Sequence, residues 1–347
     1  MTAMHQKHRA AAGFSLVEMM VAMTIGVLIL LAVSEVFISN NRTFTELEKT
    51  SRQIENGRYA MQLLESELAN AGFLGESLGW AFPGGGSIPP ACAEDHDDIE
   101  STMGVPVFGE NDVASSAAPS CLGSFKTGND YLAVRRASTC AVGSAGCEGF
   151  RAGEYHLRVS ACLSSNSGDV TLERPASLAG MSGVWGRGCA AGGGLAPTYR
   201  YLSRLYYVRD GDILARAELQ DPTAATKYVV TPLVDGIERL HFEYGLDSDG
   251  DGSVDAFDAS PGGVEWDDVV AVRIWLLARN LDPTPGYTDG RTYRIPGLDD
   301  YTPNDNFKRQ LYSSTVRLNN VAGRRELPAL AAAPEDETAD SAEPTGS

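Results

Sequence analysis

The residues with the clearest potential for chemistry form a short acidic segment between positions 247 and 258. Calcium takes six to eight oxygen ligands, and helix–loop–helix calcium sites draw them from loop positions 1, 3, 5, 7, 9 and 12, with glycine at position 6. If Asp247 is position 1, glycine falls at position 6 as Gly252. The oxygen-bearing positions are then Asp247, Asp249, Asp251, Ser253 (through its carbonyl), Asp255 and Asp258. This spacing predicts a structural calcium ion bound by these six residues.

Two features of the segment leave an alternative open. Asp258 stands where such loops usually carry a longer, bidentate glutamate, and the flanking residues have the pattern of strands instead of helices. Magnesium fits less well than calcium, because it seldom uses an all-protein cage. The alternative interpretation is a solvated turn of aspartate and glycine that holds no ion.

Six cysteines form the second group with chemical potential, and they are Cys92, Cys121, Cys140, Cys147, Cys162 and Cys189. None forms a Cys-x-x-Cys pair, and no histidine lies at zinc spacing from them, so zinc and thioredoxin-like sites are disfavoured. An even number of cysteines behind an export-type N-terminus favours disulfides in an oxidising compartment. The short loop between Cys140 and Cys147 makes these two the preferred pair, while the other pairings stay open.

The sequence offers no signature of an enzyme. It contains no G-x-S-x-G, no H-E-x-x-H and no phosphate-binding glycine loop, and His156 and His241 lie in strand-like runs where packed histidines are common. The formal net charge of −18 also disfavours direct nucleic-acid binding, which needs clustered Lys and Arg.

The N-terminus has the organisation of a cleavable leader followed by a membrane helix. Residues 1–13 are short and polar and carry Lys7 and Arg9, and an apolar run extends from Phe14 to about Ile38. A helix over that run would be roughly 37 Å long, enough to cross a bilayer core of about 30 Å. The positive charges before the run keep the leader on the cytoplasmic side. Glu18 is unusual within this run, because a carboxylate at membrane depth is costly and therefore usually functional.

The segment Gly13-Phe14-Ser15-Leu16-Val17-Glu18 resembles the type IV prepilin motif. The resemblance implies that a prepilin peptidase cuts between Gly13 and Phe14 and that Phe14 is then N-methylated. Two charges in an apolar filament core are tolerated only when they are paired. We therefore expect Glu18 to pair with the Phe14 ammonium of a neighbouring subunit and to set subunit register. The alternative is a plain signal anchor that carries an isolated glutamate.

Two further segments resemble the PilW family of minor pilins more specifically. They are residues 56–64 (NGRYAMQLL) and 71–75 (AGFLG). This resemblance implies an inner-membrane protein with a periplasmic C-terminus that is later built into a pilus. It also implies other minor pilins, the major pilin and a large tip adhesin as partners.

The elements that must position these residues begin with one long helix. Leu47, Ile54, Met61 and Leu68 recur every seven residues and predict an amphipathic stripe beyond the membrane segment. Gly72 supplies a stop in the left-handed conformation. A break near Asn40-Asn41 or Gly57 is the alternative to a single helix over 14–71.

Strand-like runs follow the helix from residue 131 onward. They span residues 131–136, 155–159, 199–208, 213–219, 237–244, 269–278 and 310–318, with a hairpin expected at Asp210-Gly211. Residues 75–130 are expected to be irregular. The predicted fold is α+β and type IV pilin-like: a long N-terminal helix, transmembrane in its first half, packed on an antiparallel β-sheet with a disulfide-containing, loop-rich insert.

The resulting domain plan has five parts. They are the leader (1–13), the transmembrane or filament-core helix (14–39), the amphipathic half of the helix (40–74), a β-rich periplasmic domain (75–325) and a disordered acidic tail (326–347). The leading functional hypothesis is a minor pilin in the priming or tip complex of a type IV pilus. Two alternatives remain: a minor pseudopilin of a type II secretion system, and a cell-adhesion module carried on a pilin stalk, with its binding surface in residues 75–230.

Overall fold

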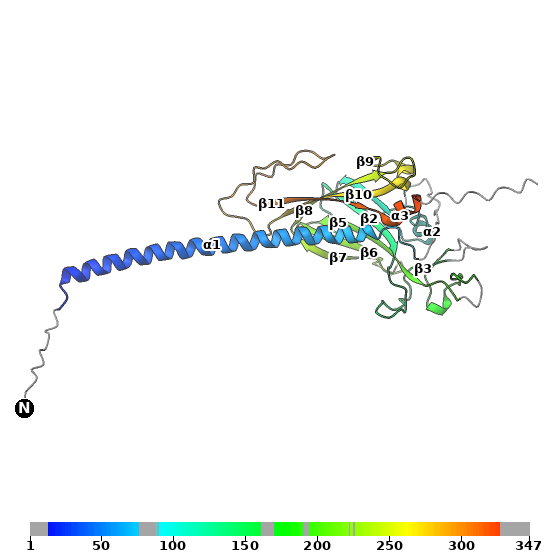
Figure 1. The fold of residues 1–347 in the computed structure, drawn as a ribbon, viewed down its shortest axis with the longest axis horizontal. Coiled ribbons are helices and arrows are strands. Elements are labelled where there is room, and N and C mark those ends of the chain that lie inside the picture. The colour runs from blue at the N-terminus through cyan, green and yellow to red at the C-terminus, as the bar shows by residue number, and fades with distance from the viewer. Residues whose placement is uncertain are drawn as a thin grey trace, which may run out of the picture. The chain divides into compact units, whose positions relative to one another are not determined.

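The computed structural model describes residues 13–75, 88, 90–160, 170–189, 194–221, 223–224 and 226–326. The chain divides into two compact units, Met1–Ser51 and Arg52–Ser347. Helix α1 (Leu16–Ala69) belongs to both, because it crosses the boundary between Ser51 and Arg52 (Figure 1).

Helix α1 is continuous through Asn40-Asn41 and Gly57, so the alternative of two helices is wrong. It begins with a reciprocal cap, in which Glu18 N–H donates to Ser15 Oγ (3.2 Å) and Ser15 N–H donates to Glu18 Oε2 (3.0 Å). It ends before Gly72, whose φ of +69° is the left-handed conformation that the sequence predicted.

The antiparallel β-structure that the sequence predicted is confirmed, and in the second unit it is arranged as two sheets. The first sheet has the order β1-β2-β5-β3-β4. In addition, β6 pairs with β5, and β7 pairs with β6. Its strands are β1 (Val107–Val113), β2 (Asn129–Ala137), β3 (His156–Val159), β4 (Val170–Glu173), β5 (Tyr199–Arg209), β6 (Ile213–Leu219) and β7 (Tyr228–Asp235). The predicted hairpin is confirmed, since β5 and β6 pair up to Arg209 and Ile213 around Gly211 (φ +88°).

The second sheet has the order β11-β10-β8-β9. Its strands are β8 (Ile237–Leu246), β9 (Ala256–Asp258), β10 (Val269–Arg279) and β11 (Arg309–Arg317). The described part of the second unit also has short helices: α2 (His96–Ser101), η1 (Leu178–Gly180), η3 (Gly263–Asp268) and α3 (Asn319–Arg325). The expectation that residues 75–130 are irregular is wrong for β1 and α2. In β1 the pairing shifts between Glu110 and Val113, which obscures the strand pattern.

Side chains of β2 join the two sheets at the edge of β8. Asn129 Oδ1 accepts the N–H of Leu240 (2.8 Å), and Asp130 Oδ2 accepts the N–H of Phe242 (2.8 Å). These acceptors satisfy backbone donors that a neighbouring strand would otherwise take, so the two sheets form one continuous core.

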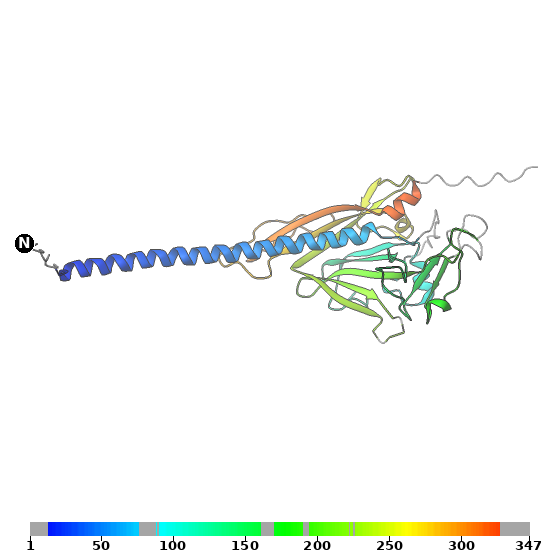
Figure 2. The same cartoon turned by 60° about the horizontal axis from the view of Figure 1, so that its bottom comes forward.

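The C-terminal part of α1 packs on both sheets (Figure 2). Its buried residues are Gln53, Gly57, Ala60, Met61, Leu64, Glu67 and Leu68. The predicted stripe is correct for Met61 and Leu68 but wrong for Leu47 and Ile54, which are 61% and 38% exposed. A strict seven-residue repeat drifts by about 20° per heptad on a straight helix, which carries the early members off the packed face.

Candidate functional site

The first functional region is the start of α1. Phe14 is 91% exposed, and the large apolar residues from Leu16 to Ile38 are each more than half exposed. This helix is long and apolar enough to cross a membrane. The Glu18 carboxylate accepts the N–H of Ser15, so it has one hydrogen-bond partner within its own chain. Gly13 is the first described residue and directly precedes Phe14, and residues 1–12 of the leader lie outside the described part of the chain.

The second region is the face of α1 that fixes the helix on the sheets, which we call the helix seat (Gln53, Gly57 and Glu67 with their partners). Gln53 is 5% exposed and donates its Nε2 to the carbonyl of Ala278 on β10 (3.0 Å). Gly57 lies against Tyr312 of β11 so closely that an added Cβ would come within 2.4 Å of the tyrosine ring. The seat therefore depends on a buried amide and an absent side chain as well as on apolar contacts.

Glu67 forms the charged end of the helix seat. Its carboxylate accepts hydrogen bonds from Arg136 on β2 (3.0 Å) and from Arg204 on β5 (3.0 Å). Arg204 also bonds Glu218 on β6 (3.0 Å), so the network continues across three strands. Burial alone would raise the pKa of Glu67, but the hydrogen bonds and charges of Arg136 and Arg204 outweigh it and lower that pKa.

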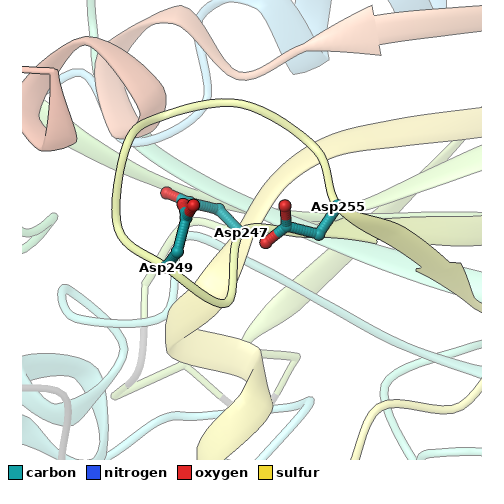
Figure 3. A group of neighbouring side chains, drawn as sticks. All are labelled: Asp247, Asp249 and Asp255. Carbon is teal, nitrogen blue, oxygen red and sulfur yellow. The ribbon is translucent and has the colours of Figure 1, made fainter.

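The third region is the acidic loop, whose three carboxylates Asp247, Asp249 and Asp255 converge as Figure 3 shows. One oxygen from each lies within 4.8 Å of the others. Two loop glycines adopt left-handed backbone, Gly250 (φ +82°) and Gly252 (φ +84°), and this turns the chain tightly around the buried Asp247 side chain.

Asp247 is also the best-connected residue of the loop. Its carboxylate accepts the N–H groups of Gly250 (2.8 Å) and Gly252 (2.9 Å) and a hydrogen bond from Arg325 of α3 (3.1 Å). Burial would raise the pKa of Asp247, but these donors and the Arg325 charge lower it. Arg325 is therefore an internal counter-ion that a bound cation would have to accommodate.

The remaining predicted ligands do not all join this group. Asp251 accepts the N–H of Ser253 (2.7 Å), and Asp258 accepts the N–H of Ser260 (2.8 Å). Asp258 lies on β9 opposite Tyr244, and an extended strand carries it away from the loop centre where a helical turn would bring it back. Of the six predicted ligands, the carboxylates of Asp247, Asp249 and Asp255 converge in the described residues, and the roles of Asp251, Ser253 and Asp258 stay predictions.

Two disulfides lie wholly within the described residues. Cys92 bonds Cys121 and Cys140 bonds Cys147, with Cα atoms 5.9 and 5.6 Å apart. Cys189 is disulfide-bonded as well, and Cys162 lies outside the described residues.

The two strand histidines are packed side chains. His241 is fully buried with Nδ1 2.8 Å from Asp130 Oδ2, and His156 Nδ1 lies 2.9 Å from the carbonyl of Glu154. Among the described hydrogen bonds, neither histidine has a serine, threonine or cysteine side chain as its partner.

Sequence reasoning missed Glu67 and its arginine partners and also Asn129 and Asp130. A glutamate at a stripe position, three residues after Leu64 and one before Leu68, was the available signal for Glu67. The signal for Asn129 and Asp130 was weaker, because two polar residues after Gly128 are typical of any turn.

Two family models match the chain. The model of the prokaryotic N-terminal methylation motif matches residues 8–34, and the model of the Type IV Pilus-assembly protein W family (PilW) matches residues 205–320. No curated protein matches the chain significantly.

Two solved structures are similar at low identity. The type IV-like pilin TTHA1219 from Thermus thermophilus is 14% identical with a TM-score of 0.36, and the alignment covers 78% of this chain and 98% of that one. A chain of the GspK-GspI-GspJ complex from the enterotoxigenic Escherichia coli Type 2 Secretion System is 11% identical with a TM-score of 0.30, covering 75% and 96%. At these scores neither likeness adds to the fold argument, which rests on this chain's own helix and sheets.

A methylation motif, a membrane-length N-terminal helix and antiparallel sheets packed on the same helix define the class of type IV pilin-like proteins. Within that class, the two family matches are those of a PilW-family type IV minor pilin, which takes part in pilus assembly. Such a pilin is anchored in the inner membrane before it is built into the pilus. The family is a structural one whose members interact with other pilins.

Proposed function

We propose that this minor pilin belongs to the low-copy complex that starts filament growth and stays at the pilus tip. The observation that carries the proposal is the size of its second unit, Arg52–Ser347. A compact domain of that length has a radius of gyration of about 19 Å, against about 14 Å for one of ~120 residues. A repeating helical shaft must place every subunit's domain side by side, so a larger domain favours a position outside the repeat.

In assembly, Gly13, Phe14 and Glu18 at the start of α1 would each have a role. A prepilin peptidase would cut between Gly13 and Phe14, and methylation would follow at Phe14. Glu18 would pair with the Phe14 ammonium of a neighbouring subunit, because the apolar surroundings make an unpaired charge costly. The partners of this step would be other minor pilins and the major pilin, and a large tip adhesin would bind once the tip is formed. No step in this role requires catalysis by the chain.

The location of the chain in purified pili tests this proposal. An epitope tag inserted after Ser347 should label filament ends under immunogold electron microscopy, and quantitative mass spectrometry should find few copies per pilus. Deletion of the gene should reduce the number of pili and leave the diameter of the remaining filaments unchanged. Labelling along the whole shaft, at an abundance near that of the major pilin, would refute the tip position.

We also propose that the acidic loop binds calcium as a structural ion. The favouring observation is that Asp247, Asp249 and Asp255 converge around the glycine turn that their spacing predicted. Three carboxylates supply part of the six to eight oxygens that calcium needs, and carbonyl groups or water would supply the rest. Because Arg325 already balances Asp247, we expect weak affinity, on the order of 10⁻⁴–10⁻³ M, as in extracellular modules.

Calorimetric titration of the full chain in detergent tests the calcium proposal. Calcium should bind and raise the unfolding temperature, and magnesium at the same concentration should do neither. The double substitution Asp249→Asn/Asp255→Asn should abolish binding, whereas Asp258→Asn should leave it within about twofold. Equal loss in both variants would restore Asp258 as a ligand, and no binding to the unaltered chain would leave the loop as an ion-free turn.

A further inference from the structure

A cleft of about 800 Å³ lies in the second unit, away from both the helix seat and the acidic loop. Its walls come from three places: the segment around α2, the strand β4 and the turn at Thr223. The lining residues are Glu94, Asp95, His96, Glu100, Tyr155, the run from Val170 to Arg174, Ser182 and Thr223. The Cys92–Cys121 disulfide lies two residues before Glu94, so one wall is fixed covalently.

The cleft is anionic, with four carboxylates and one guanidinium among its lining residues. The guanidinium of Arg174 is already engaged: it donates from Nε to the carbonyl of Gly153 (3.1 Å) and lies over the Tyr155 ring at 5.6 Å. Glu94 is paired with Lys227, and Glu173 accepts the N–H of Ser182 (2.9 Å).

The carboxylates of Asp95 and Glu100 are less committed. Asp95 stands at the N-cap position of α2, yet its side chain makes no capping hydrogen bond there. Glu100 lies 4.0 Å from the exposed imidazole of His96, which carries a charge only when protonated. Both acids are exposed, so they are available to a ligand that brings positive charge into the cleft.

The opposite wall is the open edge of a sheet. Within the described residues β4 pairs with β3 alone, and β4 ends the strand order of the first sheet. Successive side chains of a strand point to opposite faces. All residues from Val170 to Arg174 line the cleft, so the cleft borders the edge of the strand and not one of its faces.

We propose that this cleft binds an extended, cationic peptide segment of a partner protein. The segment would add alongside β4 through backbone hydrogen bonds and place Lys or Arg side chains against Asp95 and Glu100. An exposed strand edge supplies affinity for any extended backbone, and the acidic wall selects the charge of its side chains. The proposal does not depend on where in the pilus the chain lies.

A peptide fits this site better than a small amine. The volume is large for a single ammonium group, and the strand edge offers donors and acceptors that a polyamine or an amino sugar would leave unused. Asp95 and Glu100 also line the cleft from a separate element, α2 and its N-cap, where they could meet charged side chains of an added strand.

Fluorescence anisotropy with the full chain in a non-ionic detergent tests the proposal. The probe is a dye-labelled hexapeptide, Lys-Val-Lys-Val-Lys-Val, and the comparison probe replaces each lysine with glutamate. The lysine probe should bind, more weakly at high salt, and the glutamate probe should not. A version of the lysine probe with an N-methyl group on every backbone nitrogen should bind at least tenfold more weakly, because it has no N–H group to donate to the strand edge.

Paired variants locate the site. Asp95→Asn/Glu100→Gln should weaken the lysine probe about fivefold or more, since each exposed charge pair contributes about two- to fivefold. Asp97→Asn/Asp98→Asn removes the same charge from the same helix but from residues that do not line the cleft, and it should stay within twofold. Equal losses in the two variants, full binding of the N-methylated probe, or complete displacement by spermidine at equal charge concentration would each overturn the proposal.

Discussion

The two halves of α1 use the same secondary structure for opposite purposes. Before Ser51 its large apolar side chains are exposed, and its first turn is held by the local cap between Ser15 and Glu18. After Arg52 its buried face includes Gln53, Gly57 and Glu67, each fitted to a specific partner on a strand. The first half leaves its apolar surface open to lipid or to other subunits, whereas the second half is packed on the sheets of its own chain. Substitutions in the two halves should therefore separate folding from assembly.

Removing the charge of Glu67 should have the largest effect on folding. Glu67→Gln removes the carboxylate that pairs with Arg136 in a buried site and leaves Arg204 with Glu218 alone, and we expect the free energy of unfolding to fall by about 3 kcal/mol. Urea unfolding of the full chain in detergent, followed by tryptophan fluorescence, measures this. Glu65→Gln is the matched control two residues away and should change the free energy of unfolding by less than about 0.5 kcal/mol. If both variants behave alike, Glu67 is not an anchor.

The same network predicts how stability depends on pH. The pKa of Glu67 is lowered in the folded chain from its ordinary value of 4.5. Its contribution is therefore complete above about pH 4.5 and is lost as the pH falls through the lower, folded value. The difference in unfolding free energy between the unaltered chain and Glu67→Gln should be constant from pH 8 to 5 and shrink below pH 4.5. A difference that persists undiminished at pH 2 would contradict this origin.

Filling the space at Gly57 should have an intermediate effect. An alanine Cβ would overlap the Tyr312 ring, so Gly57→Ala should lower the free energy of unfolding by about 1–2 kcal/mol although alanine favours the helix. Gly323→Ala in α3 meets no atom within 4 Å and should be neutral or stabilising. Tyr312→Ala should remove most of the penalty of Gly57→Ala in a double-mutant cycle, and additive losses would show that the strain lies elsewhere.

These residues also show what the sequence could and could not reveal. Local pattern is sufficient to predict the membrane helix, its glycine end and seven of the strands, which are β2, β3, β5, β6, β8, β10 and β11. Strand β7 escaped prediction because Pro232 and a half-exposed edge weaken its alternation. Strand β4 also escaped prediction, because four residues are too few to show a clear alternation.

The division into two sheets depends on contacts that no local pattern records. Asn129 and Asp130 bond backbone groups more than a hundred residues away on β8. The acidic loop was predicted from spacing, yet the position of Asp258 on β9 was decided by strand pairing with Tyr244. The packed face of α1 was predicted through Met61 and Leu68. The helix seat (Gln53, Gly57 and Glu67) was missed, because an apolar repeat records neither polar residues nor glycine.

Substitutions at the start of α1 should have the smallest effect on folding and a large one on assembly. Glu18→Gln and Ser15→Ala both alter the cap, whose loss frays a helix end at a cost of about 1 kcal/mol that stays local. Neither should shift the unfolding of the second unit measurably, because the side chains around both residues are exposed. They differ in one respect: Ser15→Ala keeps the carboxylate, and Glu18→Gln removes it. If Glu18 pairs with the Phe14 ammonium of a neighbour, Glu18→Gln should reduce the number of pili by at least tenfold, while Ser15→Ala should keep more than half of them in electron micrographs. Equal losses in the two variants would make the cap, and not the charge pair, the reason for the glutamate.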